Sequence, residues 1–557
     1  MSDLALLLGG FVIGLLLQLP DVARKAESWF SRLANRRAWA VLICAGVATL
    51  PRLALLPWLP PPEPAIQDEF SYVLGAQTFA AGRLTNPTPA FWQHFESFHI
   101  NMVPSYQSMY PPAPSLFYAL GIVVGGNPWW GVWLATGLMC AAICWALQPL
   151  VRPRYALLAG LLCALKYGMF TIFSDSFWGG SVAALGGAVT LGAFVRLIAG
   201  PRLWHVSLMV LGLGVLANSR PFEGLLFALP VLIATLVWML KKRHCEVLVS
   251  ATGLLALLFA GMGYYNLRGT GHVFEMPYVA NFKQYHYVRP FLGAGELPRP
   301  QYRHVAMATL YDQWEGEVGR LGQSASGVLA LIKQKFRFYY QRHFAPLLML
   351  ALAGTAVAFR SRMRILAYTF LLVAVGLFSE VWWPGSAHAA PLLVSFFGLA
   401  MLGIRYVRCA FRANRRVGLM WARGLMAGLL LFGIGTMTSN AIRGLEKTVA
   451  FPLPWNQERT RIIHHLERRG GEHLVFVRYF RDHPIHQEWV YNSPDIDKQP
   501  VILARMMGRT EDCRLIQHYA GRQVWLLEPD VAKYPTALVP LETTPLAPGC
   551  AARAGVN

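Results

Sequence analysis

Two adjacent carboxylates, Asp68 and Glu69, follow the apolar run that ends near residue 58. A carboxyl pair at this place could supply a general base together with a second acceptor or a metal ligand. The same residues could instead begin a helix, because Asp68 or Ser71 can accept hydrogen bonds from the free amides of a first turn. Spacing alone favours the helix cap over the catalytic interpretation.

Further charged groups lie beside or inside apolar runs, where a charge is costly and requires a partner. Asp175 lies in a short turn and could be a helix cap or a second catalytic acid. Arg220 could pair with Glu223 three residues later, or its guanidinium fork could bind a phosphate. Lys166 could be a structural lysine that reaches the interface, or it could contact a phosphate or carboxylate.

A mainly basic set of polar side chains accompanies these acids. Singly, each is typical of a solvated loop, whereas together they would suit an anionic lipid-linked substrate and a hydroxyl acceptor. The set consists of Arg268, His272, Lys283, Arg289, Glu380 and His388. The sequence holds no phosphate-binding loop, zinc-type Cys/His spacing, nucleophile elbow or dinucleotide fingerprint, so chemistry on soluble nucleotides is not indicated.

The composition places these residues in a membrane protein. Of 557 residues, 55% are apolar and 14% are charged, and the mean hydropathy is +0.38, well away from the balance of soluble chains. The net charge of +21 alone would suggest a nucleic-acid partner. The basic residues instead punctuate long apolar runs, so we expect a polytopic α-helical membrane protein with no nucleic-acid partner.

About twelve membrane-spanning helices are predicted, because a span needs about 20 apolar residues. Their ranges are 4–19, 38–58, 128–148, 154–172, 178–198, 204–218, 224–241, 247–265, 344–360, 363–380, 388–406 and 417–437. Residues 1–19 could instead be a cleaved signal peptide, but they lack a basic leading region and a convincing cleavage site.

The short connections between spans predict the orientation, since Lys and Arg concentrate on the cytoplasmic side. One set of connections holds nineteen such residues, and the opposite set holds only Arg220. The first set is therefore cytoplasmic, and the large segments 59–127, 266–343 and 438–557 lie outside.

The outer segments are expected to carry their own elements. Residues 70–82 predict an amphipathic helix at the membrane interface. A short helix should follow Pro114, and residues 333–342 should form another interfacial helix. Residues 438–557 contain two strand-like runs with a helical pattern between them, which predicts a small α/β domain outside the transmembrane module 1–437.

Cysteine placement agrees with this orientation. Six of the eight cysteines fall in the spans or on the cytoplasmic side, and only Cys513 and Cys550 lie outside. These two could form a disulfide in an oxidising compartment, or they could be two unrelated thiols.

Several short motifs occur along the chain. They are Asp68-Glu69-Phe70-Ser71-Tyr72, Gly82-Arg83-Leu84-Thr85-Asn86-Pro87, Tyr110-Pro111-Pro112-Ala113-Pro114, Phe173-Ser174-Asp175-Ser176 and Ser219-Arg220-Pro221. Together they resemble the C-type integral membrane glycosyltransferases, in particular the superfamily of protein mannosyltransferases and lipid A aminoarabinose transferases. Ala113 stands where the family usually has glycine, and Ala389, after His388, replaces a tyrosine.

The resemblance implies an inverting transfer of a sugar from a polyprenyl-phosphate carrier to a cell-envelope acceptor, on the outer face of a bacterial inner membrane. It makes Asp68 the base that deprotonates the acceptor, and Glu69 a group that orients the acceptor or binds Mg²⁺ or Mn²⁺. Asp175 would hold the acceptor or the sugar. The expected phosphate contacts are Arg220, Lys166, Arg268 and His388, and the expected acceptor contacts are Tyr72, Tyr110 and Glu223.

Two other classes remain open at this stage. A transporter or flippase of lipid-linked sugars would use a similar outer vestibule, although repeated halves with broken helices are typical of transporters. A non-catalytic envelope assembly protein would use the C-terminal segment to bind a partner. The sequence leaves open the sugar, the acceptor and the oligomeric state.

Overall fold

The computed structural model describes residues 20–410, 414–448, 454–531 and 538–543, together with Gly9, Val12 and Thr536. The predicted span 4–19 and residue Cys550 lie outside the described residues, apart from those two single positions. Cys513 is disulfide-bonded.

Long apolar helices dominate the described chain, because helices satisfy every backbone hydrogen bond without water. Within the described ranges, seven are long and apolar enough to cross a membrane, or eight if one bent pair counts as a span. The seven are α3 (Arg37–Ala54), α6 (Trp129–Leu147), α8 (Gly180–Ala199), α10 (Pro221–Lys242), α11 (Cys245–Thr270), α18 (Leu393–Ala410, preceded by η4, Ala390–Leu392) and α19 (Arg415–Thr448).

Shorter helices occupy the other predicted spans. The bent pair joins α15 and the π-helix η3 to α16 at 90°. The multi-pass helical architecture is therefore confirmed, whereas the number twelve is not. The helices in these spans are α7 (Pro153–Tyr167), α9 (Leu203–Ala217), α16 (Leu348–Phe359) and α17 (Arg364–Ser379). Helices α15 (Ala325–Tyr339) and η3 (Tyr340–Phe344) precede α16, and α2 (Pro20–Asn35) precedes the bundle.

The first outer segment forms a compact layer of short elements. Its small antiparallel sheet has the strand order β1-β3-β2. The helix predicted over 70–82 begins earlier, and it is not an interfacial helix with one wet face, because buried residues occur all around it. The elements are α4 (Gln67–Ala80), β1 (Asn86–Pro87), η1 (Trp92–His94), β2 (Ile100–Asn101), β3 (Ser105–Ser108) and α5 (Pro112–Gly125).

The second outer segment is helical and lies between α11 and α16. Its short helices are α12 (Pro277–Tyr285), α13 (Val305–Ala308), the π-helix η2 (Thr309–Trp314) and α14 (Glu315–Leu321). The helix predicted over 333–342 belongs to α15 and η3.

The C-terminal segment contains a four-stranded sheet with the order β5-β4-β6-β7. Strand β4 pairs in parallel with β5 and β6, and β7 is antiparallel to β6. Both strand-like runs of the sequence lie in this sheet, in β4 and β6. The elements are α20 (Trp455–Arg469), β4 (His473–Val477), η5 (Ile496–Lys498), β5 (Val501–Arg505), α21 (Arg509–His518), β6 (Gln523–Leu527), β7 (Leu538–Pro540) and η6 (Leu541–Thr543).

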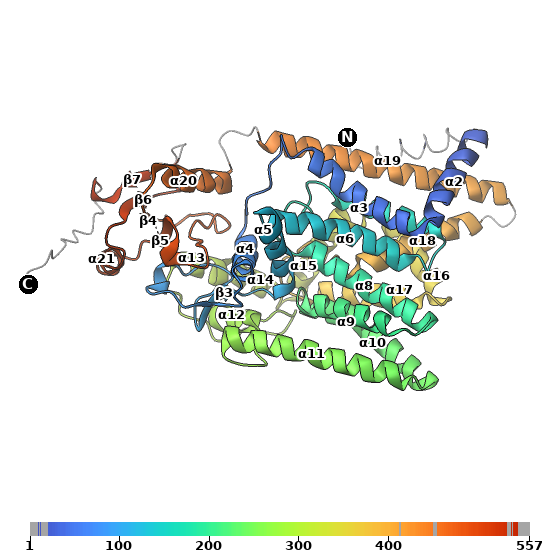
Figure 1. Cartoon of the computed structure of the whole chain (residues 1–557), viewed down its shortest axis with the longest axis horizontal. Coiled ribbons are helices and arrows are strands. Elements are labelled where there is room, and N and C mark those ends of the chain that lie inside the picture. The colour runs from blue at the N-terminus through green and yellow to red at the C-terminus, as the bar shows by residue number, and fades with distance from the viewer. Residues whose placement is uncertain are drawn as a thin grey trace, which may run out of the picture.

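The long helices pack as a bundle with the outer elements at one end. Helix α6 packs against α3 and α8, and α9 packs against α8 and α11. Figure 1 shows α3, α6, α8 and α11 running in a common direction, with the C-terminal sheet beyond one end of the bundle. The first turn of α4 lies in the outer layer between the bundle and this sheet.

Candidate active site

Asp68 lies in the first turn of α4 and keeps part of its carboxylate open. The Tyr110 hydroxyl donates a hydrogen bond to Asp68 Oδ1, and His99 Nδ1 lies 3.6 Å from the same oxygen. The Asp68 side chain is 26% exposed, so a substrate hydroxyl can still reach it. Ile66, not Asp68 or Ser71, is the N-cap residue, and it makes no side-chain cap.

Ser71, one turn after Asp68, positions both neighbours of the carboxylate. Its hydroxyl donates to the His99 carbonyl at 2.6 Å and lies 2.8 Å from the Ser108 hydroxyl. Ser108 in turn accepts the backbone N–H of Tyr110. Burial lowers the pKa of His99 below its usual 6.5, so the imidazole is neutral at pH 7. Burial also raises the pKa of Tyr110 well above its usual range, which keeps its hydroxyl a donor.

Tyr72 and Arg220 extend the site away from Asp68. The Tyr72 ring stacks on Tyr110 with centroids 4.4 Å apart. Within the described chain, the buried Tyr72 hydroxyl has no hydrogen-bond partner. Burial raises the pKa of Tyr72 to about 12, with Arg220 acting in the opposite direction and Asp68 and Glu223 adding to the rise. These five side chains therefore share one electrostatic environment.

The Glu69 carboxylate accepts hydrogen bonds from backbone amides rather than from the side chains around Asp68. Its two carboxylate oxygens accept the N–H groups of Ala65 at 2.6 Å and Phe177 at 3.0 Å. Burial raises the pKa of Glu69 to about 7, although these hydrogen bonds oppose the rise. Both Glu69 oxygens already accept backbone N–H groups, and its predicted role as a metal ligand stays a prediction.

Asp175 forms a buried ion pair with Arg52 near the outer end of α3. Arg52 Nε lies 2.7 Å from Asp175 Oδ1, and the two side chains are 1% and 9% exposed. The other carboxylate oxygen accepts the Phe170 N–H at 2.8 Å and the Ser174 hydroxyl at 2.9 Å. These contacts tie the 170–175 turn to α3, and among the described residues no hydrogen bond or ion pair joins Asp175 to Asp68.

Two predicted phosphate contacts lie apart from Asp68. Lys166 Nζ donates to the carbonyls of His343 at 2.7 Å and Ala345 at 2.8 Å, so it links α7 to the bend after η3. Arg268 has an exposed side chain in the last turn of α11. No contact recorded among the described residues brings either group to Asp68 or Arg220.

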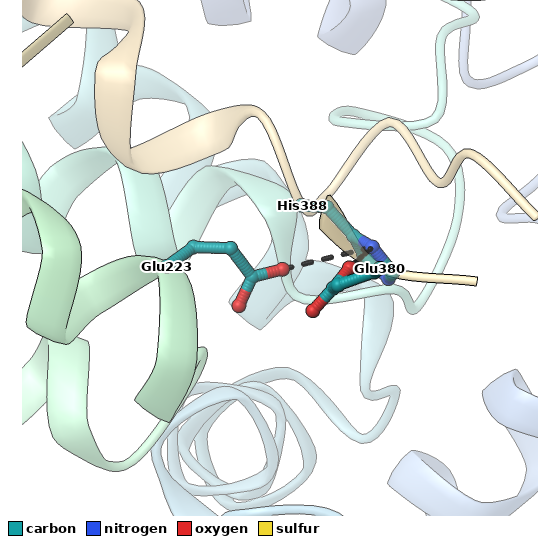
Figure 2. Close-up of side chains that lie close together, drawn as sticks. All are labelled: Glu223, Glu380 and His388. Carbon is teal, nitrogen blue, oxygen red and sulfur yellow. Dashed lines mark ion pairs between the residues drawn. The ribbon is translucent and has the colours of Figure 1, made fainter. Parts of the chain in front are cut away.

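Glu223 and His388 meet a third residue, Glu380, at the outer ends of α10 and α17. His388 Nδ1 lies 3.6 Å from Glu223 Oε1 and 3.6 Å from Glu380 Oε2. Figure 2 shows the three side chains pointing toward one another from separate segments. Within the described ranges, this is the group of three whose nitrogen and carboxylate atoms lie close enough to hold a metal ion.

Sequence reasoning missed several of these partners. Arg52 was overlooked although a charge within a span signals a buried partner. His99 carried no signal, since its role depends on the Ser71 contact. His486 was missed as well, and it lies 3.1 Å from Gln67 at the start of α4. Sequence spacing does not pair Glu380 with Glu223, which the fold brings together.

The C-terminal segment covers the outer side of α4. The Phe70 ring stacks on Tyr491 with centroids 4.2 Å apart, and Arg459 lies over the same ring. Arg83 and Asp495 form a two-bond ion pair at 2.8 and 2.9 Å. The segment is thus fixed to the layer that carries Asp68.

The fold is similar to that of known membrane glycosyltransferases. The structure of ArnT from Cupriavidus metallidurans in the apo state aligns with a TM-score of 0.50 and 13% identity, over 91% of this chain and 94% of ArnT. ArnT is the lipid A aminoarabinose transferase. The chain therefore has the fold of the C-type glycosyltransferases, as the sequence motifs predicted.

A second similar structure is the Archaeoglobus fulgidus oligosaccharyltransferase tethered with an acceptor peptide. It aligns with a TM-score of 0.48 and 12% identity, over 81% of this chain. This chain spans 62% of the length of that protein. No protein-family model matches the chain, and no curated protein sequence is significantly similar to it.

Proposed function

We propose that this protein is a glycosyltransferase that moves a sugar from a polyprenyl-phosphate carrier to a hydroxyl of a cell-envelope acceptor. The reaction takes place on the extracytoplasmic face of a bacterial inner membrane. The observation that carries this proposal is the Asp68 carboxylate, half-buried against Tyr110 and His99 and within the charge field of Arg220. The C-type glycosyltransferase fold supports it.

Asp68 is the general base. The phenol stays protonated and donates to the carboxylate, and the neutral imidazole adds no positive charge that would weaken Asp68 as a base. Asp68 accepts the proton of the acceptor hydroxyl as the hydroxyl oxygen bonds to the anomeric carbon. The bond from that carbon to the phosphate oxygen breaks on the opposite face, its electron pair leaves with the polyprenyl phosphate, and the configuration inverts.

Arg220 stabilises the charge on the leaving phosphate. Burial opposes the guanidinium charge, but Tyr72, Glu223, Tyr110 and Asp68 together raise the pKa of Arg220 above its usual value. A fixed cation in a buried site favours a developing anion more than the same cation in water. The unpaired Tyr72 hydroxyl beside it can donate a further hydrogen bond to a phosphate oxygen.

The C-terminal segment that follows α19 serves acceptor recognition. It is anchored on α4 through Phe70 and Tyr491, and His486 reaches the turn before Asp68. An acceptor hydroxyl at Asp68 would therefore lie close to this segment.

The proposal is tested by transfer measurements on Asp68 variants. The protein in membranes is supplied with a panel of labelled polyprenyl-phosphate sugars, and release of the polyprenyl phosphate is followed. Asp68→Asn and Asp68→Ala are expected to lose at least about 10²-fold in rate, since a positioned base contributes about 10²–10⁴-fold. Glu63→Gln, an exposed carboxylate five residues earlier, is the matched control. Full transfer by folded Asp68→Asn would end the proposal.

A further inference from the structure

We infer that Glu223, Glu380 and His388 bind one divalent transition-metal ion of the zinc type. The three residues come from separate segments: the first turn of α10, the position after α17, and the loop before η4. Figure 2 shows that the imidazole and both carboxylates converge on a common point. All three ligand atoms lie within 4.8 Å of one another.

The spacing suits ligands of a shared ion better than hydrogen-bonded partners. His388 Nδ1 lies 3.6 Å from an oxygen of each carboxylate, which is longer than the roughly 2.7–3.2 Å of an N–H···O hydrogen bond. A tetrahedral zinc ion with nitrogen and oxygen ligands at about 2.0–2.2 Å holds neighbouring ligand atoms about 3.4 Å apart. The two separations from His388 match that edge within a few tenths of an ångström.

The Glu223 and Glu380 carboxylates bring two negative charges together, and a bound cation would neutralise them. The side chains of Glu223 and Glu380 are 6% and 12% exposed, and two carboxylates this close repel each other. In the described part of the chain, neither carboxylate accepts a hydrogen bond from another side chain. Arg220, one turn before Glu223, is shared with Asp68. A divalent cation would supply the missing positive charge.

The surrounding structure fixes the ligands in place. Lys335 Nζ donates to the carbonyl of Glu380 and, at 3.0 Å, to that of Leu377, so the end of α17 is held from α15. The backbone of Glu380 also forms an isolated antiparallel β-bridge with that of Phe291 in the second outer segment. A Cβ atom at Gly385 would lie 3.0 Å from His388 Cδ2 and 3.1 Å from its Nε2, so the imidazole rests against a residue without a side chain.

The donor set indicates the class of metal. Imidazole suits zinc, iron and similar ions, whereas Mg²⁺ prefers oxygen ligands alone. Three protein ligands leave at least one position open, as in catalytic zinc sites. If the donor phosphate occupies that open coordination position, this further step rests on the proposed function. Metal binding by the three residues does not.

Metal titration of the full-length protein tests the inference. The protein is purified without a histidine tag, stripped with a chelator, and titrated with Zn²⁺ alone, and bound metal is counted by mass spectrometry. The wild type is expected to bind one equivalent. His388→Ala and Glu223→Gln should bind at least about 100-fold more weakly, whereas His272→Ala, an exposed histidine, should bind as the wild type does.

A variant that keeps every ligand guards against simple misfolding. Gly385→Ala crowds the imidazole and is expected to weaken metal binding about tenfold, within the range for groups that orient a ligand. X-ray absorption of the zinc-loaded wild type should show one nitrogen among oxygen neighbours. A wild type that binds no metal, or a His388→Ala variant that binds equally well, would overturn the inference. No sugar donor enters these measurements, so their outcome is separate from that of the transfer assay.

Discussion

Replacing Asp175 by asparagine separates structural support from chemistry at a position that the sequence motifs suggested as catalytic. The change keeps the shape of the side chain but removes the charge that faces Arg52 across 2.7 Å. Arg52 would keep its hydrogen bonds to the carbonyls of Leu59 and Pro60. It would also keep its cation–π contacts with the rings of Trp129 and Phe170.

The expected loss of stability follows from this environment. Removing one partner of a buried ion pair costs about 3–5 kcal/mol, because it leaves an uncompensated buried charge. The carbonyl and aromatic contacts of Arg52 place Asp175→Asn at the low end, at about 3 kcal/mol. The double variant Arg52→Met, Asp175→Asn leaves no unpaired charge, so we expect a coupling energy of about 2 kcal/mol.

Unfolding in mixed micelles with increasing SDS measures these differences, and transfer is assayed where each variant stays folded. Folded Asp175→Asn is expected to transfer sugar within about threefold of the wild type, since a base or its direct partner would contribute about 10²–10⁴-fold. A fully stable Asp175→Asn, or a stable variant without transfer, would refute the structural role.

Three further predictions concern the site and its support. Tyr110→Phe removes the hydroxyl that donates to Asp68, and transfer should fall about 10- to 100-fold, in line with about 1.5–3 kcal/mol for a hydrogen bond to a charged group; an unchanged rate would contradict the assigned contact. Arg220→Ala should weaken donor binding about 100-fold and Arg220→Lys less, measured by titration with polyprenyl phosphate; equal binding by all three proteins would contradict the phosphate role. The pKa of Glu69 is raised from 4.5 to about 7 by burial, so the folded state binds this proton more tightly than the unfolded state does. The resulting stability, up to about 3 kcal/mol, is present below pH 4.5 and lost as the pH rises through 7, and Glu69→Gln should flatten the stability–pH curve over that window.

The sequence predicted the parts of the fold that depend on local pattern. Apolar runs located the helices, and β-rich runs located β4 and β6. Helix ends were less predictable: α7 stops at Tyr167, and Phe170 then takes a left-handed backbone conformation with φ of 50°. Hydropathy alone does not predict the turn at which α7 ends.

The site was predicted only where a motif contained its residues. Asp68, Tyr72, Tyr110 and Arg220 come together as the family resemblance implied. Lys166 donates instead to the carbonyls of His343 and Ala345, more than a hundred residues away, which single-sequence spacing does not relate. Arg268 has an exposed side chain in the last turn of α11.

The most direct measurement of the central claim is a structure of the full-length protein with polyprenyl phosphate bound. The account predicts the phosphate on the Arg220 guanidinium and within hydrogen-bond reach of the Tyr72 hydroxyl, with the Asp68 carboxylate facing the place of the sugar carbon. A phosphate bound at Lys166 or Arg268 with no contact to Arg220, remote from Asp68, would contradict it.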